Sequence, residues 1–250
     1  MKTTHIEADQ NTTIGEIVAA DFRTAAVFSE YGIDFCCKGD RTLEQVCTKK
    51  GIAEEELLAK LEQVYRIENN NTIDFKSWPP DLLADYIEKK HHRYVAAKTP
   101  ILLEFLHKLS KVHGARHPEL INIYKIFSDS AIDLAAHMKK EEEILFPFIR
   151  NLVNARNATA ITTSDRFDRI ENPIAMMKEE HVVEGDRFAA ISALSSNYSI
   201  PDDACSTYKV TYAMLAEFEK DLHAHIHLEN NILFPAAIAL QASLLLAVHQ

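Results

Sequence analysis

Apolar residues recur at intervals of three to four positions along most of the chain, which is the spacing of one face of an α-helix. After residue 73 this spacing persists over four long segments, and we expect helices at residues 81–112, 119–150, 172–194 and 204–240. Four long amphipathic helices in series predict an antiparallel four-helix bundle.

Shorter helical segments precede the bundle, at residues 14–31, 43–50 and 54–66. The polar run Asn69-Asn70-Asn71-Thr72 interrupts the helical spacing, and the Pro79-Pro80 pair that follows can open a helix but cannot continue one. We therefore divide the chain into a small helical domain over residues 1–72 and a four-helix bundle over residues 73–250. The 6 glycines are few for a β-rich or α/β chain, so the expected fold class is all-α.

Charge and cysteine usage limit the partners that this chain can have. The formal net charge of −10 repels phosphate backbones and anionic membranes. The longest apolar run, residues 242–248, is too short to span a bilayer, and residues 1–10 do not resemble a secretory signal. The 4 cysteines are irregularly spaced, which fits a reducing compartment. We expect a cytoplasmic protein that binds neither nucleic acid nor membrane.

One motif occurs twice within the bundle. The segments that begin at His137 and at His225 both read His-x-x-x-Glu-x-x-Ile-Leu-Phe-Pro. Residues four apart lie on the same helix face, so each copy directs an imidazole and a carboxylate to one point. A further histidine precedes each copy by a similar distance, since His92 stands 45 residues before His137 and His181 stands 44 before His225. The bundle therefore reads as two copies of one helical hairpin.

The donor atoms of this repeat suit a pair of metal ions. Four imidazoles and two carboxylates are more than one tetrahedral zinc needs, and they form a harder set than thiolates, which favours iron or manganese. If Glu141 and Glu229 both bridge, each metal receives two imidazoles and a share of two carboxylates. We interpret the Ile-Leu-Phe-Pro segments as core residues and helix-end signals.

Other polar residues of the bundle leave alternatives open. His91 and His92 compete for one ligand position, and periodicity does not separate them. We interpret His107, His113 and His117 as solvated. We interpret His223 and His227 as residues at the surface or beside the ligands. We interpret Glu180 and Glu184 as part of a charged helix face, and a place beside the ligands or along a channel is the alternative.

Two adjacent thiols form a second candidate site, in the segment Asp34-Phe35-Cys36-Cys37-Lys38-Gly39. Adjacent cysteines between short helices suit transient redox chemistry, contact with a partner or contact with a soft metal. The alternative is that one or both only fill space in the core, as free cysteine often does. We expect Cys47 and Cys205 to be core residues.

These motifs together resemble the RIC family (repair of iron centres), the YtfE/ScdA type of di-iron protein. The N-terminal match is the motif over residues 31–39 followed by Thr42-Leu43, which looks like the small ScdA-type domain of that family. The C-terminal match is a hemerythrin-like bundle. The resemblance covers nearly the whole chain.

The resemblance implies a non-haem di-iron centre with two bridging carboxylates, oxo- or hydroxo-bridged. It selects His92 over His91, because His92 stands eight residues before Pro100 as the family ligand stands before its proline. It implies a role in restoring iron-sulfur clusters after nitrosative or oxidative stress, through iron donation or nitric oxide handling. The implied metal ligands are His92, His137, Glu141, His181, His225 and Glu229.

Several functional alternatives follow from these expectations. Damaged iron-sulfur proteins and nitric oxide or oxygen would be the partners, and the iron pair could reduce nitric oxide. A sensor or store that binds nitric oxide, oxygen or iron without turnover is the main alternative, and a structural bundle around a redox-inert metal is another. A domain of about 60 residues is marginal alone, so we expect it to pack on its own bundle or on a second subunit, and we favour a homodimer.

Overall fold

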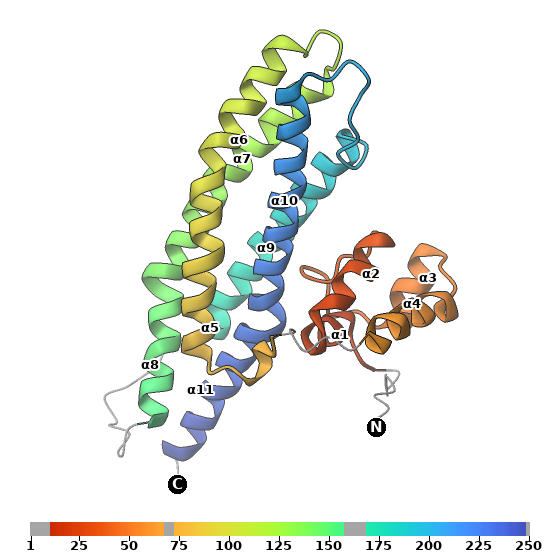
Figure 1. The fold of residues 1–250 in the computed structure, drawn as a ribbon. Helices are drawn as coiled ribbons and strands as arrows, with labels where there is room; N and C mark the ends of the chain where they lie inside the picture. Colours follow the sequence, from red (N-terminus) through yellow and green to blue (C-terminus); the bar gives the residue numbers. More distant parts are fainter. Residues whose placement is uncertain (1–10, 68–72, 158–168, 249–250) are drawn as a thin grey trace. The chain divides into compact units, whose positions relative to one another are not determined.

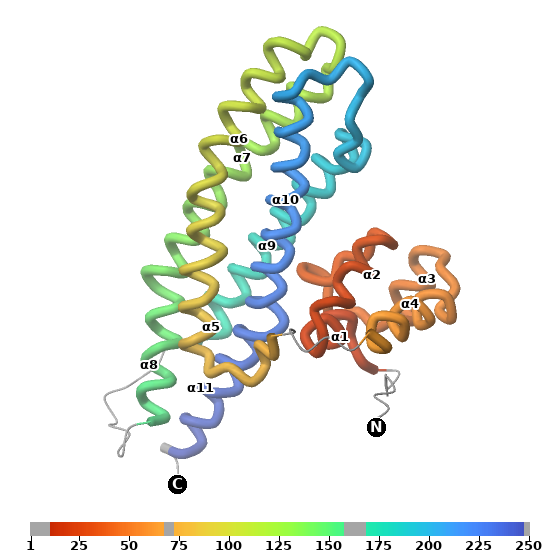
Figure 2. The backbone as a smooth tube through the Cα atoms, in the orientation of Figure 1, coloured from red at the N-terminus to blue at the C-terminus, as the bar shows by residue number. Residues whose placement is uncertain are grey.

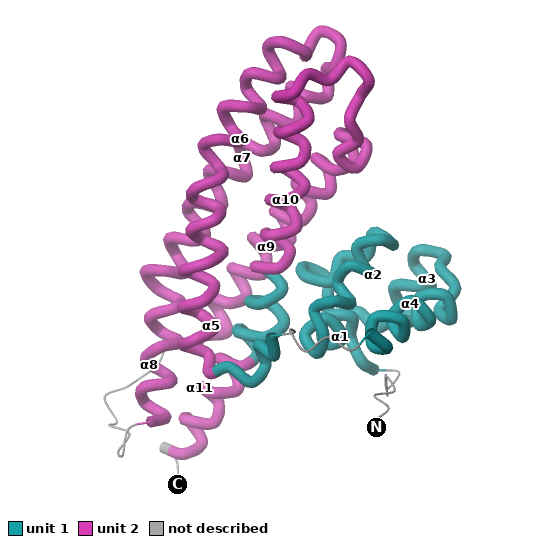
Figure 3. Tube along the Cα trace, viewed as in Figure 1, with its two compact units in different colours: residues 1–78, 226–235 teal, residues 79–225, 236–250 magenta. Residues whose placement is uncertain are grey.

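The computed structural model describes residues 11–67, 73–157 and 169–248. These residues are helical apart from turns, connections and one isolated bridge between Thr13 and Thr42, so the expected all-α class is confirmed (Figure 1). Contacts divide the chain into two compact units (Figure 3): residues 1–78 with 226–235, and residues 79–225 with 236–250. The domain boundary expected after residue 72 falls on residues 68–72, which lie outside the described residues.

The N-terminal part of unit 1 is built from short helices with well-defined starts. Thr13 and Thr42 each begin a helix through a reciprocal capping box, with Glu16 and Gln45 as the third helical residues. The helix expected over residues 14–31 is interrupted at Asp21, where the backbone is extended and the side chain caps the next turn. The elements are α1 (Ile14–Ala20), η1 (Phe22–Thr24), α2 (Ala25–Glu30), α3 (Leu43–Lys50), α4 (Glu54–Arg66) and η2 (Phe75–Ser77).

Four long helices follow, and three of them contain a π-helical turn. The first is α5 (Pro80–Ile87), η3 (Glu88–His92) and α6 (Arg93–Val112), and the second is α7 (Glu119–Lys140), η4 (Glu141–Leu145) and α8 (Phe146–Asn157). The third is α9 (Glu171–Leu194), and the fourth is α10 (Ser206–Leu228), η5 (Glu229–Leu233) and α11 (Phe234–Val248). We expected the Ile-Leu-Phe-Pro segments to mark helix ends, and this is wrong. The second and fourth helices continue well beyond both prolines.

The bundle core lies between facing helices. In unit 2, α6 packs against α7, α7 against α9 and α5 against α8. Figure 2 shows the first helix, in yellow, returning as the second, in green, through the short connection after α6. Phe127, Phe188 and Phe218 come from three different helices and meet with ring centroids 5.4–6.3 Å apart. These rings supply the apolar contact that the helical spacing of the sequence predicted.

The fourth helix is long and apolar enough, by length and composition alone, to cross a membrane over Ser206–Ala247. It is the one such helix among the described residues. However, His225 and Glu229 on this helix are buried, at 1% and 0% exposure. Buried ionisable side chains that face other helices are typical of a bundle core, so we interpret Ser206–Ala247 as a core helix.

Candidate metal centre

Six side chains from all four bundle helices carry the chemistry that the sequence repeat predicted. His92 ends η3, whereas Glu141 and Glu229 begin η4 and η5. The six have relative exposures of 0–4%: His92, His137, Glu141, His181, His225 and Glu229. A buried carboxylate is costly unless a cation or hydrogen bonds compensate its charge.

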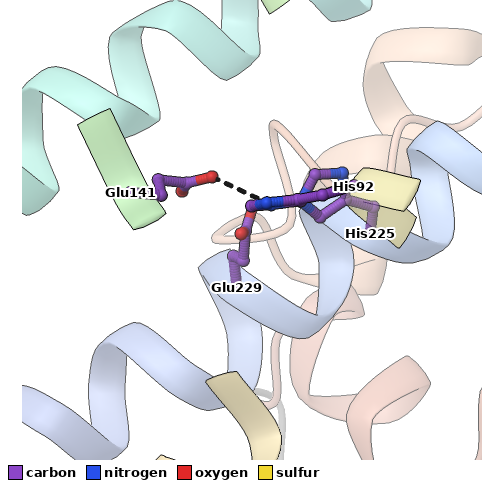
Figure 4. A group of neighbouring side chains, drawn as sticks. All are labelled: His92, Glu141, His225 and Glu229. Atoms are coloured by element: carbon purple, nitrogen blue, oxygen red, sulfur yellow. Dashed lines mark ion pairs between the residues drawn. The ribbon is translucent and has the colours of Figure 1, made fainter. Parts of the chain in front are cut away.

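The six side chains form two groups of potential metal ligands that share their carboxylates. The first group is His92, Glu141, His225 and Glu229. Figure 4 shows that these side chains converge, and its dashed line marks the ion pair between Glu141 and His92. The second group is His137, Glu141, His181 and Glu229. Within each group the ligand atoms lie within 4.8 Å of one another. Two buried groups that share two carboxylates are consistent with a binuclear metal site.

Glu141 is oriented as a bridging carboxylate would be. Its Oε2 atom lies 3.3 Å from Nε2 of His92, and its Oε1 atom lies 3.4 Å from Nε2 of His137. The two oxygens of one carboxylate therefore each face a histidine of a different group. In the second group the Nε2 atoms of His137 and His181 are only 3.0 Å apart, so both are directed at the same point.

Two carboxylates outside the groups orient the histidines. Nδ1 of His92 lies 2.8 Å from Glu142 Oε1, and Nδ1 of His137 lies 2.7 Å from Glu180 Oε2. An ionised carboxylate only accepts hydrogen bonds, so Nδ1 donates and Nε2 keeps the lone pair that a metal needs. Burial acts to raise the pKa of Glu180, but the hydrogen bonds from Lys140 and His137 outweigh it and lower the pKa.

The sequence did not identify Glu142 and Glu180 as hydrogen-bond partners of the histidines. We favoured a charged helix face for Glu180, which instead contacts His137. Glu142 was not considered at all, because nothing distinguishes it from its neighbours in the run Glu141-Glu142-Glu143. Only the position of the adjacent helix identifies either residue as a partner of a histidine.

The structure separates the two adjacent histidines of the first helix. His92 belongs to a group of potential ligands, whereas His91 does not. Nδ1 of His91 lies 3.1 Å from Asp221 Oδ2, and its ring stacks on His225 with 5.6 Å between centroids. His91 therefore packs beside the ligand groups and supports His225 from the outside.

We expected His227 either at the surface or beside the ligands, and its burial excludes the surface. His227 is 1% exposed and belongs to unit 1, where its ring contacts Phe22 and Phe35. Its Nδ1 atom lies 2.9 Å from the Asn231 amide nitrogen. Burial, with a smaller contribution from Lys76, lowers the pKa of His227 to about 3, so the ring is neutral.

Three further expectations about burial are corrected and one is confirmed. His113, expected to be solvated, is 6% exposed, and its Nε2 atom lies 3.3 Å from Sγ of Cys205. Cys47 is buried, as expected. Cys205 was also expected in the core but is exposed. Glu184 is buried, and Ser130 donates a 2.5 Å hydrogen bond to it; burial raises its pKa despite that bond.

Neither of the adjacent thiols of unit 1, Cys36 and Cys37, is part of a disulfide. Their sulfur atoms are 3.6 Å apart, and Sγ of Cys36 lies 3.4 Å from Oδ1 of Asp34. The hydrogen bond with Cys37 and burial, together with the nearby Asp34 carboxylate, raise the pKa of Cys36 well above its usual range. Cys36 is therefore protonated at neutral pH in the absence of a cation.

Comparison with known proteins agrees with this arrangement. Residues 10–65 match ScdA_N, a domain of unknown function, and residues 83–237 match the hemerythrin HHE cation binding domain. The chain is 31% identical over 226 residues to the iron-sulfur cluster repair protein YtfE of Musicola paradisiaca, covering 90% of this chain and 96% of that protein. It is 30% identical over 225 residues to the iron-sulfur cluster repair protein ScdA of a Staphylococcus epidermidis strain, covering 88% and 95%.

Proposed function

The chain belongs to the family of iron-sulfur cluster repair proteins with a hemerythrin-type cation-binding domain, and from this membership we propose that it restores clusters damaged by nitrosative or oxidative stress. The observation that carries the proposal is the pair of buried groups that share Glu141 and Glu229. A metal centre of this kind is the part of the molecule that can exchange iron or react with small oxidants.

We assign two non-haem iron ions to the two groups. Each ion would receive two imidazoles and a share of two carboxylates, which is a donor set that suits iron better than a soft thiolate-binding metal. The two glutamates offset two of the four positive charges of a ferrous pair in a buried site. Four protein donors per ion leave coordination positions open, and the bound pair would supply redox chemistry at those positions.

The protein side chains have defined tasks in this proposal. Glu141 would help to hold both ions, because its two oxygens contact His92 and His137, which belong to different groups. Glu142 and Glu180 accept hydrogen bonds from Nδ1 of these histidines, which would leave Nε2 available to a metal. Either iron donation to a damaged cluster or removal of nitric oxide from it would use this centre. We propose a cytoplasmic location for the protein.

Metal analysis tests the centre directly. Iron, zinc and manganese per chain are measured in protein purified without added metal, for wild type, Glu141→Ala and the control Glu143→Ala. Glu143 lies in the same helical turn, but its side chain is 63% exposed. We expect close to two irons per chain in wild type and control, and loss of both in Glu141→Ala because that carboxylate serves both groups. One zinc, or the same metal content in all three proteins, would refute the centre.

A repair assay then tests the function. A purified enzyme with a [4Fe–4S] cluster is inactivated with nitric oxide and incubated with the iron-loaded protein or with Glu141→Ala. Recovery with the loaded protein alone supports repair, and isotopically labelled iron in the bundle distinguishes donation from nitric oxide removal. Nitric oxide binding without recovery would instead identify a sensor or store.

A further inference from the structure

Unit 1 contains a third group of side chains with the chemistry of metal ligands. Asp34, Cys36 and Cys37 follow α2 in the connection to α3, and their ligand atoms lie within 4.8 Å of one another. They share no residue with the two bundle groups. Two thiols and one carboxylate also differ in kind from the imidazoles and carboxylates of the bundle.

The distances within this group match those around one small cation. A tetrahedral cation holds sulfur at about 2.3 Å and carboxylate oxygen at about 2.0–2.2 Å, which places two sulfurs about 3.8 Å apart and sulfur about 3.6 Å from oxygen. The observed separations are 3.6 Å between the sulfurs and 3.4 Å from Cys36 Sγ to Asp34 Oδ1. A disulfide would instead need the sulfurs about 2.05 Å apart.

The charges of the group favour a cation over any other ligand. All three side chains are anionic when ionised, and Cys36 is only 3% exposed. Three like charges so close together cannot ionise jointly unless protons or a cation compensate them. A divalent cation offsets two of the three charges and replaces the thiol protons, which is how thiolate sites load metal.

The loop that carries these donors is held from two sides. Asp34 Oδ1 accepts the backbone N–H groups of Cys36 and Cys37, at 3.2 and 2.9 Å. The side-chain amides of Asn230 and Asn231 donate to the carbonyl oxygens of Cys36 and Phe35, at 3.0 and 3.2 Å. The donors are therefore positioned before any ligand binds, which lowers the entropic cost of binding.

We propose that Asp34, Cys36 and Cys37 bind one thiophilic divalent cation of the class of Fe²⁺ and Zn²⁺. Three protein donors leave a fourth position open, and an open site suits exchange with another ligand better than permanent retention. If the protein donates iron, this site is a point of exchange for it; that role rests on the proposed function, whereas the metal binding itself does not.

Cobalt titration of the full-length protein tests the site. The bundle groups are first filled with iron under anaerobic conditions, with a non-thiol reductant that keeps Cys36 and Cys37 reduced. Co²⁺ is then added, because cobalt bound to thiolate gives a charge-transfer absorption that imidazole and carboxylate sites lack. We expect one equivalent of thiolate-bound cobalt per chain, displaced by added Zn²⁺.

Variants assign the absorption to its ligands. The double variant Cys36→Ser with Cys37→Ser should lose the band, and Asp34→Asn should weaken binding at least tenfold. Cys205→Ser removes an exposed thiol of unit 2 and should change nothing. A band that persists in the double variant, disappears in Cys205→Ser or is absent from wild type would overturn the proposal.

The iron content of the bundle serves as the folding control. The double variant should retain the wild-type iron content and thermal unfolding midpoint, so that loss of cobalt binding reports the thiols alone. If the bundle holds no iron but the cobalt band is present, the proposed function fails while this site stands. If the bundle holds iron but no cobalt band appears, this site is refuted while the proposed function stands.

Discussion

Replacing Glu180 with glutamine tests whether a carboxylate outside the six proposed ligands controls how tightly one metal is held. Oε2 of Glu180 lies 2.7 Å from Nδ1 of His137, and its other oxygen pairs with Lys140. An ionised acceptor at Nδ1 makes Nε2 a stronger donor toward a metal and fixes the ring. Glutamine keeps a hydrogen-bond acceptor at this position but removes the negative charge.

The size of the effect follows from the contact and its exposure. Loss of such a partner costs about 10–100-fold in metal affinity, or about 1.4–2.7 kcal/mol. The Glu180 side chain is 34% exposed, so water and Lys140 compensate in part and we expect about a tenfold loss. Glu142 is 43% exposed and 2.8 Å from His92, so Glu142→Gln should have a smaller effect.

Competition with a chelator measures the change. Iron retained per chain is followed against increasing chelator concentration for wild type, Glu180→Gln and the control Glu179→Gln. Glu179 is exposed on the same helix, so the control removes the same charge without touching His137. Since His137 belongs to one group only, one of the two irons should leave at about a tenfold lower chelator concentration.

Three results would refute the reasoning. Wild-type retention in Glu180→Gln would show that the outer carboxylate does not act on His137. An equal loss in Glu179→Gln would identify a general charge effect. Equal loss of both irons would contradict the assignment of His137 to a single group.

Two further predictions concern stability. A Cβ atom at residue 15 would lie 2.6 Å from Asn231 Oδ1 and 2.9 Å from Gly39 O. Gly15→Ala should therefore lower the free energy of unfolding by about 1–3 kcal/mol. An unchanged midpoint of urea unfolding would contradict this prediction. The hydrogen bond with Asp203 raises the pKa of His117 although burial acts to lower it, so the folded state binds the proton more tightly than the unfolded chain. This stabilisation is complete below the unfolded pKa of about 6.5 and is lost as pH rises through the folded pKa. The melting temperature of His117→Asn should therefore fall furthest below wild type near pH 5.5 and approach it by about pH 8.5; an equal gap at both would contradict the pairing.

The six candidate ligands could be predicted because the sequence repeats itself. Two copies of His-x-x-x-Glu define the same helix face twice, and nearly equal separations extend the pattern to His181 and to the His91-His92 pair. Periodicity left that pair unresolved, since the apolar stripe of the first helix is broad. Only the resemblance selected His92, and in the structure His92 joins a ligand group while His91 packs on His225.

Residues whose environment depends on a neighbouring element could not be predicted in this way. Nothing in the sequence indicated that His227 is buried, because its ring contacts Phe22 and Phe35, which lie far away in the sequence. His113 directly follows the first helix and Cys205 directly precedes the fourth, so the two are close in space but far apart in sequence. The spacing of apolar residues within a helix reports which face is buried, and carries no information on what an adjoining loop covers.

The π turns of the second and fourth helices connect the repeated motif to the geometry of the centre. In both copies the turn begins at the glutamate and spans the five residues up to Leu145 or Leu233, and the next N–H bonds back to the glutamate carbonyl. A proline follows in both, and because it has no N–H it cannot restore the α-helical bond at that point. The prolines that we interpreted as helix ends therefore follow the wider turns closely, whereas η3 in the first helix forms such a turn without a proline next to it. π turns inside α-helices are rare and are frequently found at functional sites. Its presence at the same position in both copies, where Glu141 and Glu229 enter the shared groups, indicates that the repeat preserves the backbone that aims these carboxylates as well as the carboxylates themselves.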